Sequence, residues 1–423
     1  MTGGSEMKDN FRKSKLLAAG ILLVLIVTAC DNPSGNSISM EKRQVAAAGV
    51  DVRIVKASNE FGMQLHRQLV QTEQNKKKNI FISPTSISLA LAMTYNGSKG
   101  ETQVSMAKTL GWQGMSLDEM NRGNETLISL LQQPGSDVQV RIANSLWTRK
   151  GKPFHSDFTK TNQAFYDAKI TELDFNNPKA PDTINDWVNK NTNGKIPRMI
   201  ESIDPMEVLI LMNAVYFNGG WKKEFQPSAT KEESFKLQDG STKQVQMMTQ
   251  SGSYEYLQEE EFQAIRLPYG EGQMDMLVIL PDESSSLDAL HDKLWEDPNR
   301  WHESFQSNRG EIKLPRLKIE YSEKLKEPLK AMGMTLPFDE VHADFSGMAP
   351  VPPNLFISAV THKTFIEVNE KGTEAAAVTS VHMAGASAPI DEPFQVTINR
   401  PFFFAIEDRQ TDAWLFVGSV VEP

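Results

Sequence analysis

The chain has very little cysteine, since Cys30 is the only one among 423 residues. A single cysteine excludes intramolecular disulfides, CxxC redox chemistry and zinc sites built from several cysteines. The seven histidines are scattered without HxxxH or HExxH spacing, so they predict no zinc site either. The sequence therefore predicts neither a metal nor a cofactor.

An excess of positive charge is also missing. The chain carries 44 Lys and Arg against 54 Asp and Glu, a formal net charge of -10, so we expect no nucleic-acid partner. With 39% hydrophobic and 23% charged residues, the composition argues against disordered, collagen-like and multi-span membrane proteins. Between Val52 and Pro423 there is no linker-like stretch and no internal repeat, which predicts one unusually large domain.

Motifs of common enzyme classes are absent as well. There is no Walker A loop, no GxGxxG and no GxSxG elbow. The nearest nucleophile pattern, Ser228-Ala-Thr-Lys231, lacks the SDN and KTG elements that accompany SxxK in β-lactamases, and so short a pattern arises by chance in a chain of this length. We expect a surface turn or strand edge there, and no enzymatic activity; a fluorophosphonate label on Ser228 would reveal the alternative.

The one long apolar run lies at the N-terminus, where basic residues precede positions 16–27. It is too short to span a bilayer comfortably and is typical of a signal peptide, whether translation starts at Met1 or Met7. The quartet Val27-Thr-Ala-Cys30 resembles the lipobox of bacterial lipoproteins, in which the cysteine is acylated. The alternative is an ordinary signal peptide with an incidental cysteine.

This N-terminal pattern predicts three segments: a lipoprotein signal peptide over 1–29, a flexible tether over 30–50 after a lipidated Cys30, and a folded domain over 51–423. Each buried methylene contributes about 0.8 kcal/mol, so two or three acyl chains form a stable anchor. We expect an exported protein held by its lipid on the periplasmic face or the surface of a bacterial cell.

Helical patterns crowd the first half of the chain. Phe61, Leu65 and Leu69 follow i, i+4, i+8 spacing, Ser83-Pro84 is an N-cap followed by proline, and residues 182–193 end at a glycine. Strand patterns dominate later, at 274–280, 312–319, 364–368, 402–406 and 414–421, the last two flanking a hairpin-like turn. Helices followed by antiparallel strands predict an α+β fold.

A long segment rich in small residues follows the strand-like 364–368. Between residues 369 and 393 no strong core hydrophobe occurs, although compact domains seldom keep loops longer than about 15 residues. Read with period two, one face is small and uncharged throughout: Thr373, Ala375, Ala377, Thr379 and Val381. This favours a strand that inserts into a sheet, with Gly372 as a pivot. An Ala-rich linker or a short helix over 374–378 is the alternative.

Several motifs in order resemble those of the serpin family. They are NIFISP at 79–84, LMNAVYFNGGW at 211–221, EKGTEAAA at 370–377, and NRPFFF with FVGSV at 399–404 and 416–420. The resemblance covers the chain from about Val52 to Pro423. It implies the serpin fold: a large central sheet, two smaller sheets, eight or nine helices and an exposed reactive centre loop.

The resemblance also implies a mechanism. A target serine protease cleaves the loop, becomes trapped as a covalent acyl-enzyme, and is dragged away when the loop inserts into the central sheet as a new strand. Papain-like cysteine proteases are further targets, because they also form an acyl-enzyme. The expected partners are thus a protease and, through the lipid, a membrane, with the inhibitor itself a monomer.

By this resemblance the scissile bond joins Ala386 and Ser387, which suits elastase-like or subtilisin-like proteases. The part after the bond is longer than in common members, so Met383-Ala384 is a reserve position, suited to elastase-like or chymotrypsin-like enzymes. The resemblance places the loop hinge at Glu370, Lys371, Gly372, Thr373, Glu374, Ala375, Ala376 and Ala377.

Ser83, Ser86, Asn213 and His362 match the polar cluster that serpins hold beneath the sheet where the loop inserts, and Trp221 matches the packing residue at the top of the sheet. A buried core histidine with satisfied hydrogen bonds is compatible with this role. The alternative function is a non-inhibitory serpin acting as a binding or chaperone-like module. The small hinge residues argue against it, because non-inhibitory members typically carry bulky, charged or proline residues there.

Overall fold

The computed structural model describes residues 40–72, 75, 77–204, 206–297, 305–352, 354–373 and 393–423. The predicted signal peptide, Cys30, hinge residues Glu374 to Ala377 and both candidate scissile bonds lie outside these residues. The described chain contains nine α-helices: α1 (Met40–Ala47), α2 (Val52–Val70), α3 (Pro84–Tyr95), α4 (Gly100–Leu110), α5 (Leu117–Leu131), α6 (Ser156–Tyr166), α7 (Ala180–Asn191), α8 (Leu287–Glu296) and α9 (Lys326–Ala331).

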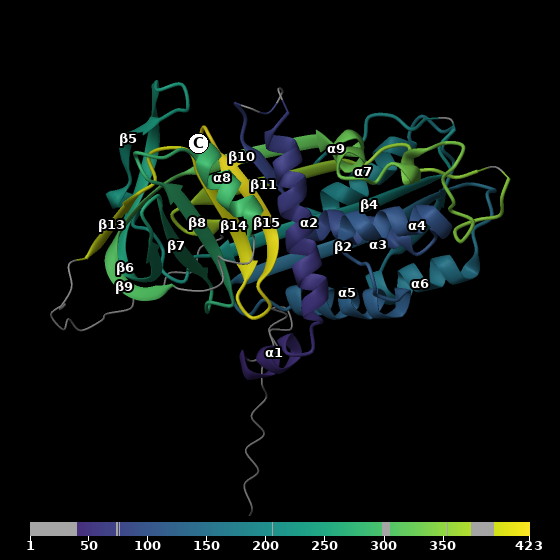
Figure 1. Cartoon of the computed structure of the whole chain (residues 1–423), viewed down its shortest axis with the longest axis horizontal. Coiled ribbons are helices and arrows are strands. Elements are labelled where there is room, and N and C mark those ends of the chain that lie inside the picture. The colour runs from purple at the N-terminus through teal and green to yellow at the C-terminus, as the bar shows by residue number, and fades with distance from the viewer. Residues whose placement is uncertain are drawn as a thin grey trace, which may run out of the picture. The chain divides into compact units, whose positions relative to one another are not determined.

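The helices form where the sequence patterns predict them. The predicted apolar stripe of α2, Phe61, Leu65 and Leu69, is buried. The Ser83 hydroxyl accepts a hydrogen bond from the Ser86 backbone N–H and caps α3, as an N-terminal serine should. In Figure 1, α2 stands between a strand-rich part of the molecule and helices α3 to α6. None of the helices in the described part of the chain has the length and apolar character needed to cross a membrane.

A six-stranded sheet has the order β10-β11-β12-β4-β2-β3. All its neighbours are antiparallel except β2 and β3, which run parallel. Its strands are β10 (Leu317–Lys324), β11 (Thr361–Asn369), β12 (Gly372–Thr373), β4 (Leu209–Gly220), β2 (Val138–Arg149) and β3 (Lys169–Leu173). It is the large central sheet that the serpin resemblance implies.

A second sheet has nine strands in the order β1-β15-β14-β8-β7-β6-β9-β13, with β5 paired to β6. The strands are β1 (Ile80–Ile82), β15 (Ala413–Val420), β14 (Phe402–Asp408), β8 (Met274–Pro281), β7 (Phe262–Tyr269), β6 (Thr242–Gln258), β9 (Gln306–Pro315), β13 (Phe394–Thr397) and β5 (Lys231–Lys236). The two smaller sheets expected from the sequence are continuous here, because the 17-residue β6 pairs with β7 near one end and with β5 and β9 elsewhere.

The strand predicted over 312–319 is wrong as a single element. The chain leaves the nine-stranded sheet at Pro315, passes through Arg316, and enters the six-stranded sheet at Leu317. The apolar residues on both sides of Arg316 are buried in different sheets, so a continuous apolar pattern concealed a change of partner. The predicted hairpin is confirmed as β14 and β15, joined through a turn at 409–412.

The boundary predicted at residue 51 needs a correction, because the described residues include a helix, α1, at Met40–Ala47. Arg43 in this helix is fully buried and forms an ion pair with the equally buried Asp408 at the end of β14. Its guanidinium also donates to the backbone oxygen of Gln133, at 2.7 Å. This long-range pairing, which composition does not reveal, holds α1 against the folded body.

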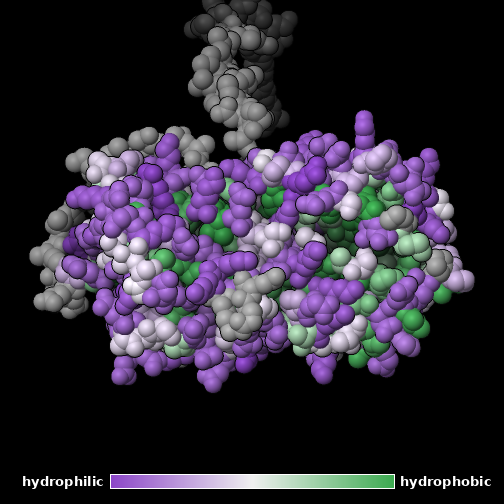
Figure 2. Space-filling model, turned by 90° about the horizontal axis from the view of Figure 1, so that it is seen from above, coloured by the Kyte–Doolittle hydropathy of each residue, from purple (hydrophilic) through white to green (hydrophobic). Residues whose placement is uncertain are grey.

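Most large apolar side chains of the described residues share one core, in which β8, β14 and β15 are buried along their full lengths. Figure 2 shows one face of the molecule, where hydrophilic side chains cover most of the surface and hydrophobic ones gather in small patches. The described hinge residues Gly372 and Thr373 and the predicted polar cluster lie at the six-stranded sheet.

Candidate functional site

The hinge residues Gly372 and Thr373 lie inside the central sheet. They form the two-residue β12, which pairs antiparallel with β11 on one side and with β4 on the other. Thr373 lies opposite Val368 of β11 and Gly219 of β4. Along the rest of their lengths β4 and β11, both fully described, have no register with each other, since the sheet order connects them only through β12. The sheet thus holds the first two residues of a strand position between β4 and β11.

Gly372 is required by this arrangement. Its φ is +144°, where side chains are strained, and a Cβ atom there would overlap the backbone oxygen of Gly219. The next residue, Thr373, is buried, and its hydroxyl shares a 2.6 Å hydrogen bond with the Tyr269 hydroxyl. The Tyr269 ring stacks on Trp221 with centroids 4.4 Å apart, and the Trp221 indole donates to the backbone oxygen of Asn369 at 2.9 Å.

An ion pair holds the residue before the pivot. Both Arg316 Nε and Nη2 donate to the carboxylate of Glu370, with the closest contact at 2.6 Å. The Thr230 hydroxyl donates to the same carboxylate, and the Phe225 N–H donates to the Glu370 backbone oxygen at 2.8 Å. Burial alone would raise the pKa of Glu370, but the hydrogen bonds from Arg316 and Thr230 outweigh it and lower that pKa. The predicted hinge therefore starts from an anchored position.

The four predicted cluster residues meet at the other part of β4 and β11. The Ser83 N–H donates to His362 Nε2 at 3.0 Å, and the Ser86 hydroxyl donates to the Asn213 side-chain oxygen. The Asn213 amide donates in turn to Asn144 Oδ1 at 2.6 Å. This chain connects the start of α3 to β11, β4 and β2, so a change in the separation of β4 and β11 must rearrange it.

His362 takes part in this chain as a neutral imidazole. Burial lowers its pKa to about 3, because the charged form would lose its hydration. With Nε2 accepting from the Ser83 N–H, the neutral ring carries its proton on Nδ1. His362 is thus the buried histidine with a satisfied acceptor that the sequence interpretation allows.

Four partners of the predicted residues were missed from the sequence: Asn144, Thr230, Tyr269 and Arg316. Each contacts a predicted residue from a distant part of the chain, so no local spacing identifies it. Only Arg316 could have been noticed in the sequence, because it is the one charged residue at 314–317, the otherwise apolar centre of the strand predicted over 312–319. The hinge and the cluster are therefore parts of a wider network than the motifs indicate.

Comparison with known proteins gives the family. The model of the serpin family, described as serine protease inhibitors, matches residues 56–423. The chain therefore belongs to the serpin family, and its fold is the serpin fold.

Relatives match almost the whole domain. Serpin B6 of Pongo abelii is 36% identical over 380 residues, covering 88% of this chain and 99% of that protein. Leukocyte elastase inhibitor of Bos taurus is 36% identical over 382 residues, covering 87% and 98% respectively. Among solved structures, tengpin, a thermophilic serpin, in its native state superposes with a TM-score of 0.78 at 32% identity, covering 92% of this chain and 96% of that chain.

Proposed function

We propose that this serpin inhibits serine proteases as a suicide substrate. The observation that carries the proposal is β12, because Gly372 and Thr373 already occupy the top of a strand position between β4 and β11. Residues that follow Thr373 in sequence can extend this strand only if alternate side chains are small or apolar. Ala375, Ala377 and Val381 meet that requirement.

The covalent step balances without any cofactor. The serine hydroxyl of the protease attacks the carbonyl carbon of Ala386, and its proton passes through the protease's base to the departing amine of Ser387. The peptide bond breaks and an ester joins Ala386 to the protease. Insertion of fifteen residues at about 3.3 Å each then carries the ester roughly 50 Å, faster than water hydrolyses it.

The driving force is the difference between two packings of one chain. The uncleaved state leaves the strand position incomplete beyond β12, and insertion adds two ladders of backbone hydrogen bonds, one to β4 and one to β11. Cleavage releases the constraint that keeps the loop out, so a metastable native state converts to a more stable one. The Ser83, Ser86, Asn213 and His362 cluster rearranges as the sheet opens.

Elastase-like or subtilisin-like proteases are the proposed targets, because alanine at position 386 suits a shallow specificity pocket. A relative that is 36% identical bears the name leukocyte elastase inhibitor, which supports this class. Cleavage after Met383 is the reserve register and favours elastase-like or chymotrypsin-like enzymes. Papain-like cysteine proteases are a further proposed class.

For location we propose export and lipidation at Cys30, with a tether that ends where α1 begins at Met40. The protein then works as a monomer on the periplasmic face or the surface of a bacterial membrane. Incorporation of radiolabelled palmitate into the chain, lost in Cys30→Ala, tests the anchor; unlabelled wild-type protein would refute it.

The test of inhibition mixes the purified protein with an elastase-like serine protease and resolves the products on denaturing gels. A band at the summed mass, together with a released peptide that begins at Ser387, is expected. A peptide beginning at Ala384 would move the bond to Met383. Complete cleavage without the heavier band, repeated for serine proteases of several specificities, would refute inhibition and favour a non-inhibitory binding or chaperone-like module.

A further inference from the structure

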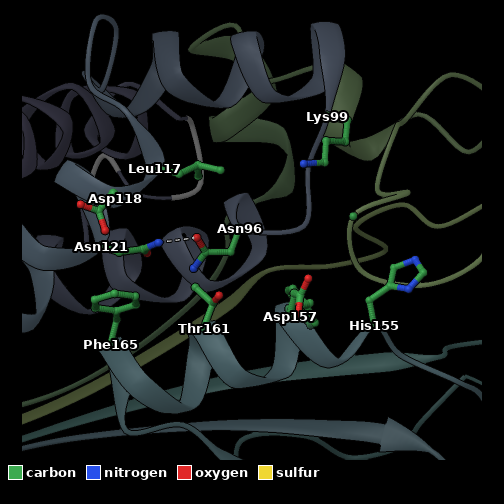
Figure 3. Close-up of a pocket in the computed structure, with 11 residues that line it drawn as sticks. Asn96, Lys99, Leu117, Asp118, Asn121, His155, Asp157, Thr161 and Phe165 are labelled. Atoms are coloured by element: carbon green, nitrogen blue, oxygen red, sulfur yellow. Dashed lines mark hydrogen bonds between the residues drawn. The ribbon is translucent and has the colours of Figure 1, made fainter.

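One cavity lies away from the hinge. It has a volume of about 790 Å³, in the range of small-molecule sites. It is bordered by the end of α2, helix α8, strands β1 and β15, the ends of β5 and β8, and the loops that adjoin these elements, including residues 399–401 before β14. Part of its wall is apolar: Val70, Ile80, Leu237, Leu287, Trp295 and Val421. A smaller cavity of about 440 Å³ has a mostly polar wall, in which Asn121 donates to Asn96 (Figure 3).

A directed chain of hydrogen bonds ends at the larger cavity. The Trp295 indole donates to His66 Nδ1 at 3.3 Å, so the neutral His66 ring carries its proton on Nε2. His66 Nε2 lies 2.9 Å from the Ser419 hydroxyl, and that hydroxyl lies 2.7 Å from His291 Nε2. The pairing that satisfies all three groups has His66 donating to Ser419 and Ser419 donating to His291, which leaves the His291 proton on Nδ1.

This last proton has no partner among the described residues. His291 is buried, and its Nδ1 makes no hydrogen bond with any described residue. The nearest carboxylate oxygen, on Asp288, is 4.0 Å away, beyond hydrogen-bonding distance. Burial also lowers the pKa of His291 to about 4, so the ring is neutral near pH 7. A buried unpaired donor costs about 1–3 kcal/mol, which a ligand acceptor that reaches Nδ1 would recover.

The positive and negative charges around the cavity are equal in number. Three cations stand against three carboxylates: Lys78, Lys236 and Arg400 against Glu283, Asp288 and Asp292. All but Arg400 are exposed, so solvent screens them. A net anion or cation therefore gains no general attraction here, while the apolar wall and Trp295 favour a ring system.

We propose that this cavity binds an uncharged, ring-bearing small molecule that presents a carbonyl or similar oxygen acceptor to His291 Nδ1. The site goes beyond protease inhibition, because it uses none of the hinge residues and none of the cluster beneath the central sheet. Its specificity comes from one buried donor in a partly apolar wall, with Trp295 as the contact for the ring.

The test titrates the full chain with prodan, an uncharged naphthalene ketone whose absorption overlaps tryptophan emission, in detergent-free buffer. We expect saturable binding with energy transfer from tryptophan, and a reduced transfer in Trp295→Phe at saturating dye, because the tryptophan in the cavity wall is removed while the other six remain. Ser285→Trp, which fills the cavity from its rim, should weaken binding at least tenfold. Thr161→Trp adds the same side chain to the smaller cavity and should leave the affinity unchanged.

The donor is tested separately. His291→Phe should weaken prodan binding about fivefold, the loss expected for one neutral hydrogen bond, and 2-(dimethylamino)naphthalene, which lacks the ketone, should bind the wild-type chain weaker by a similar factor. If Ser285→Trp binds prodan with wild-type affinity, the dye binds elsewhere, for example to the N-terminal apolar run, and the proposed site is overturned. Equal affinity for the two dyes would overturn the role of His291, even if His291→Phe fails to fold.

Discussion

A charge placed at Thr373 should convert the inhibitor into a substrate. Thr373 is 2% exposed, lies between β4 and β11, and shares its hydroxyl hydrogen with Tyr269. In Thr373→Arg the guanidinium would take the place of a hydroxyl whose hydrogen-bond partner is the uncharged Tyr269 hydroxyl. The new charge would therefore be buried without a carboxylate to pair with it. The hinge must then leave the sheet, and the loop must carry a buried charge whenever it inserts.

The magnitude follows from the burial. An unpaired buried charge costs about 3 kcal/mol or more, even after local relaxation. If that cost falls on the insertion barrier, at about 1.4 kcal/mol per factor of ten, insertion slows by roughly 150-fold. Hydrolysis of the acyl-enzyme, which does not involve Thr373, keeps its rate. Most encounters then end in cleaved serpin and free protease.

The assay titrates a fixed amount of elastase-like protease with inhibitor and measures residual activity. Wild-type protein should need about one molecule per protease, and Thr373→Arg many tens. Thr373→Val, which removes the hydroxyl but adds no charge, should stay within a few-fold of wild type. Ser234→Arg, at an exposed position on β5, controls for the added charge.

Covalent complex formed by Thr373→Arg at a stoichiometry near one would refute the reasoning. It would mean that the side chain at this position faces solvent during insertion, against the register observed for β12. Equal losses in Thr373→Arg and Thr373→Val would instead assign the effect to the Tyr269 hydrogen bond.

Three further predictions concern stability and the pivot. Arg43→Met should lower the free energy of unfolding by about 3 kcal/mol in urea melts, because it leaves Asp408 buried without its partner. The double variant Arg43→Met with Asp408→Asn should lose less than the sum of the two single losses, and strictly additive losses would contradict a direct ion pair. Because burial lowers the pKa of His362 to about 3, unfolding below pH 6.5 takes up a proton on this side chain. Its contribution to stability is therefore complete above pH 6.5 and falls by about 2 kcal/mol at pH 5. In His362→Asn this part of the difference between melts at pH 7 and pH 5 should disappear, and an unchanged difference would count against the reasoning. Gly372→Ala should strain the pivot by about 1–3 kcal/mol and eject β12, seen as a shift in tryptophan emission, whereas retained wild-type emission would contradict the close approach to Gly219.

Local patterns predicted the elements that depend on local chemistry. The N-cap at Ser83 and the stripe on Phe61, Leu65 and Leu69 are confirmed as α3 and α2, because capping and helical period involve residues three or four positions apart. The alternation in the hinge likewise predicted a strand, and its first residues are found as β12. Whether the strand continues lies outside the described residues.

The sequence did not predict which distant segments pair with each other. The run from 312 to 319 has one apolar pattern but two sheets, since an apolar period says that a face is buried and not against which strand. Arg43 reads as part of a polar tether, yet it is fully buried, because its partner Asp408 lies 365 positions away. Such pairs become visible only when the chain is folded.

The sequence by itself determined the family, the α+β class, and the small uncharged face of the hinge, because motif order and residue size are local properties. Only the tertiary structure decided that Gly372 and Thr373 pair with both β4 and β11, and that Arg316 holds Glu370. It also decided that the His291 donor at the cavity has no partner among the residues that the structure describes. Each of these depends on which distant segments become neighbours, and hydrogen bonds and burial exist only between neighbours in space.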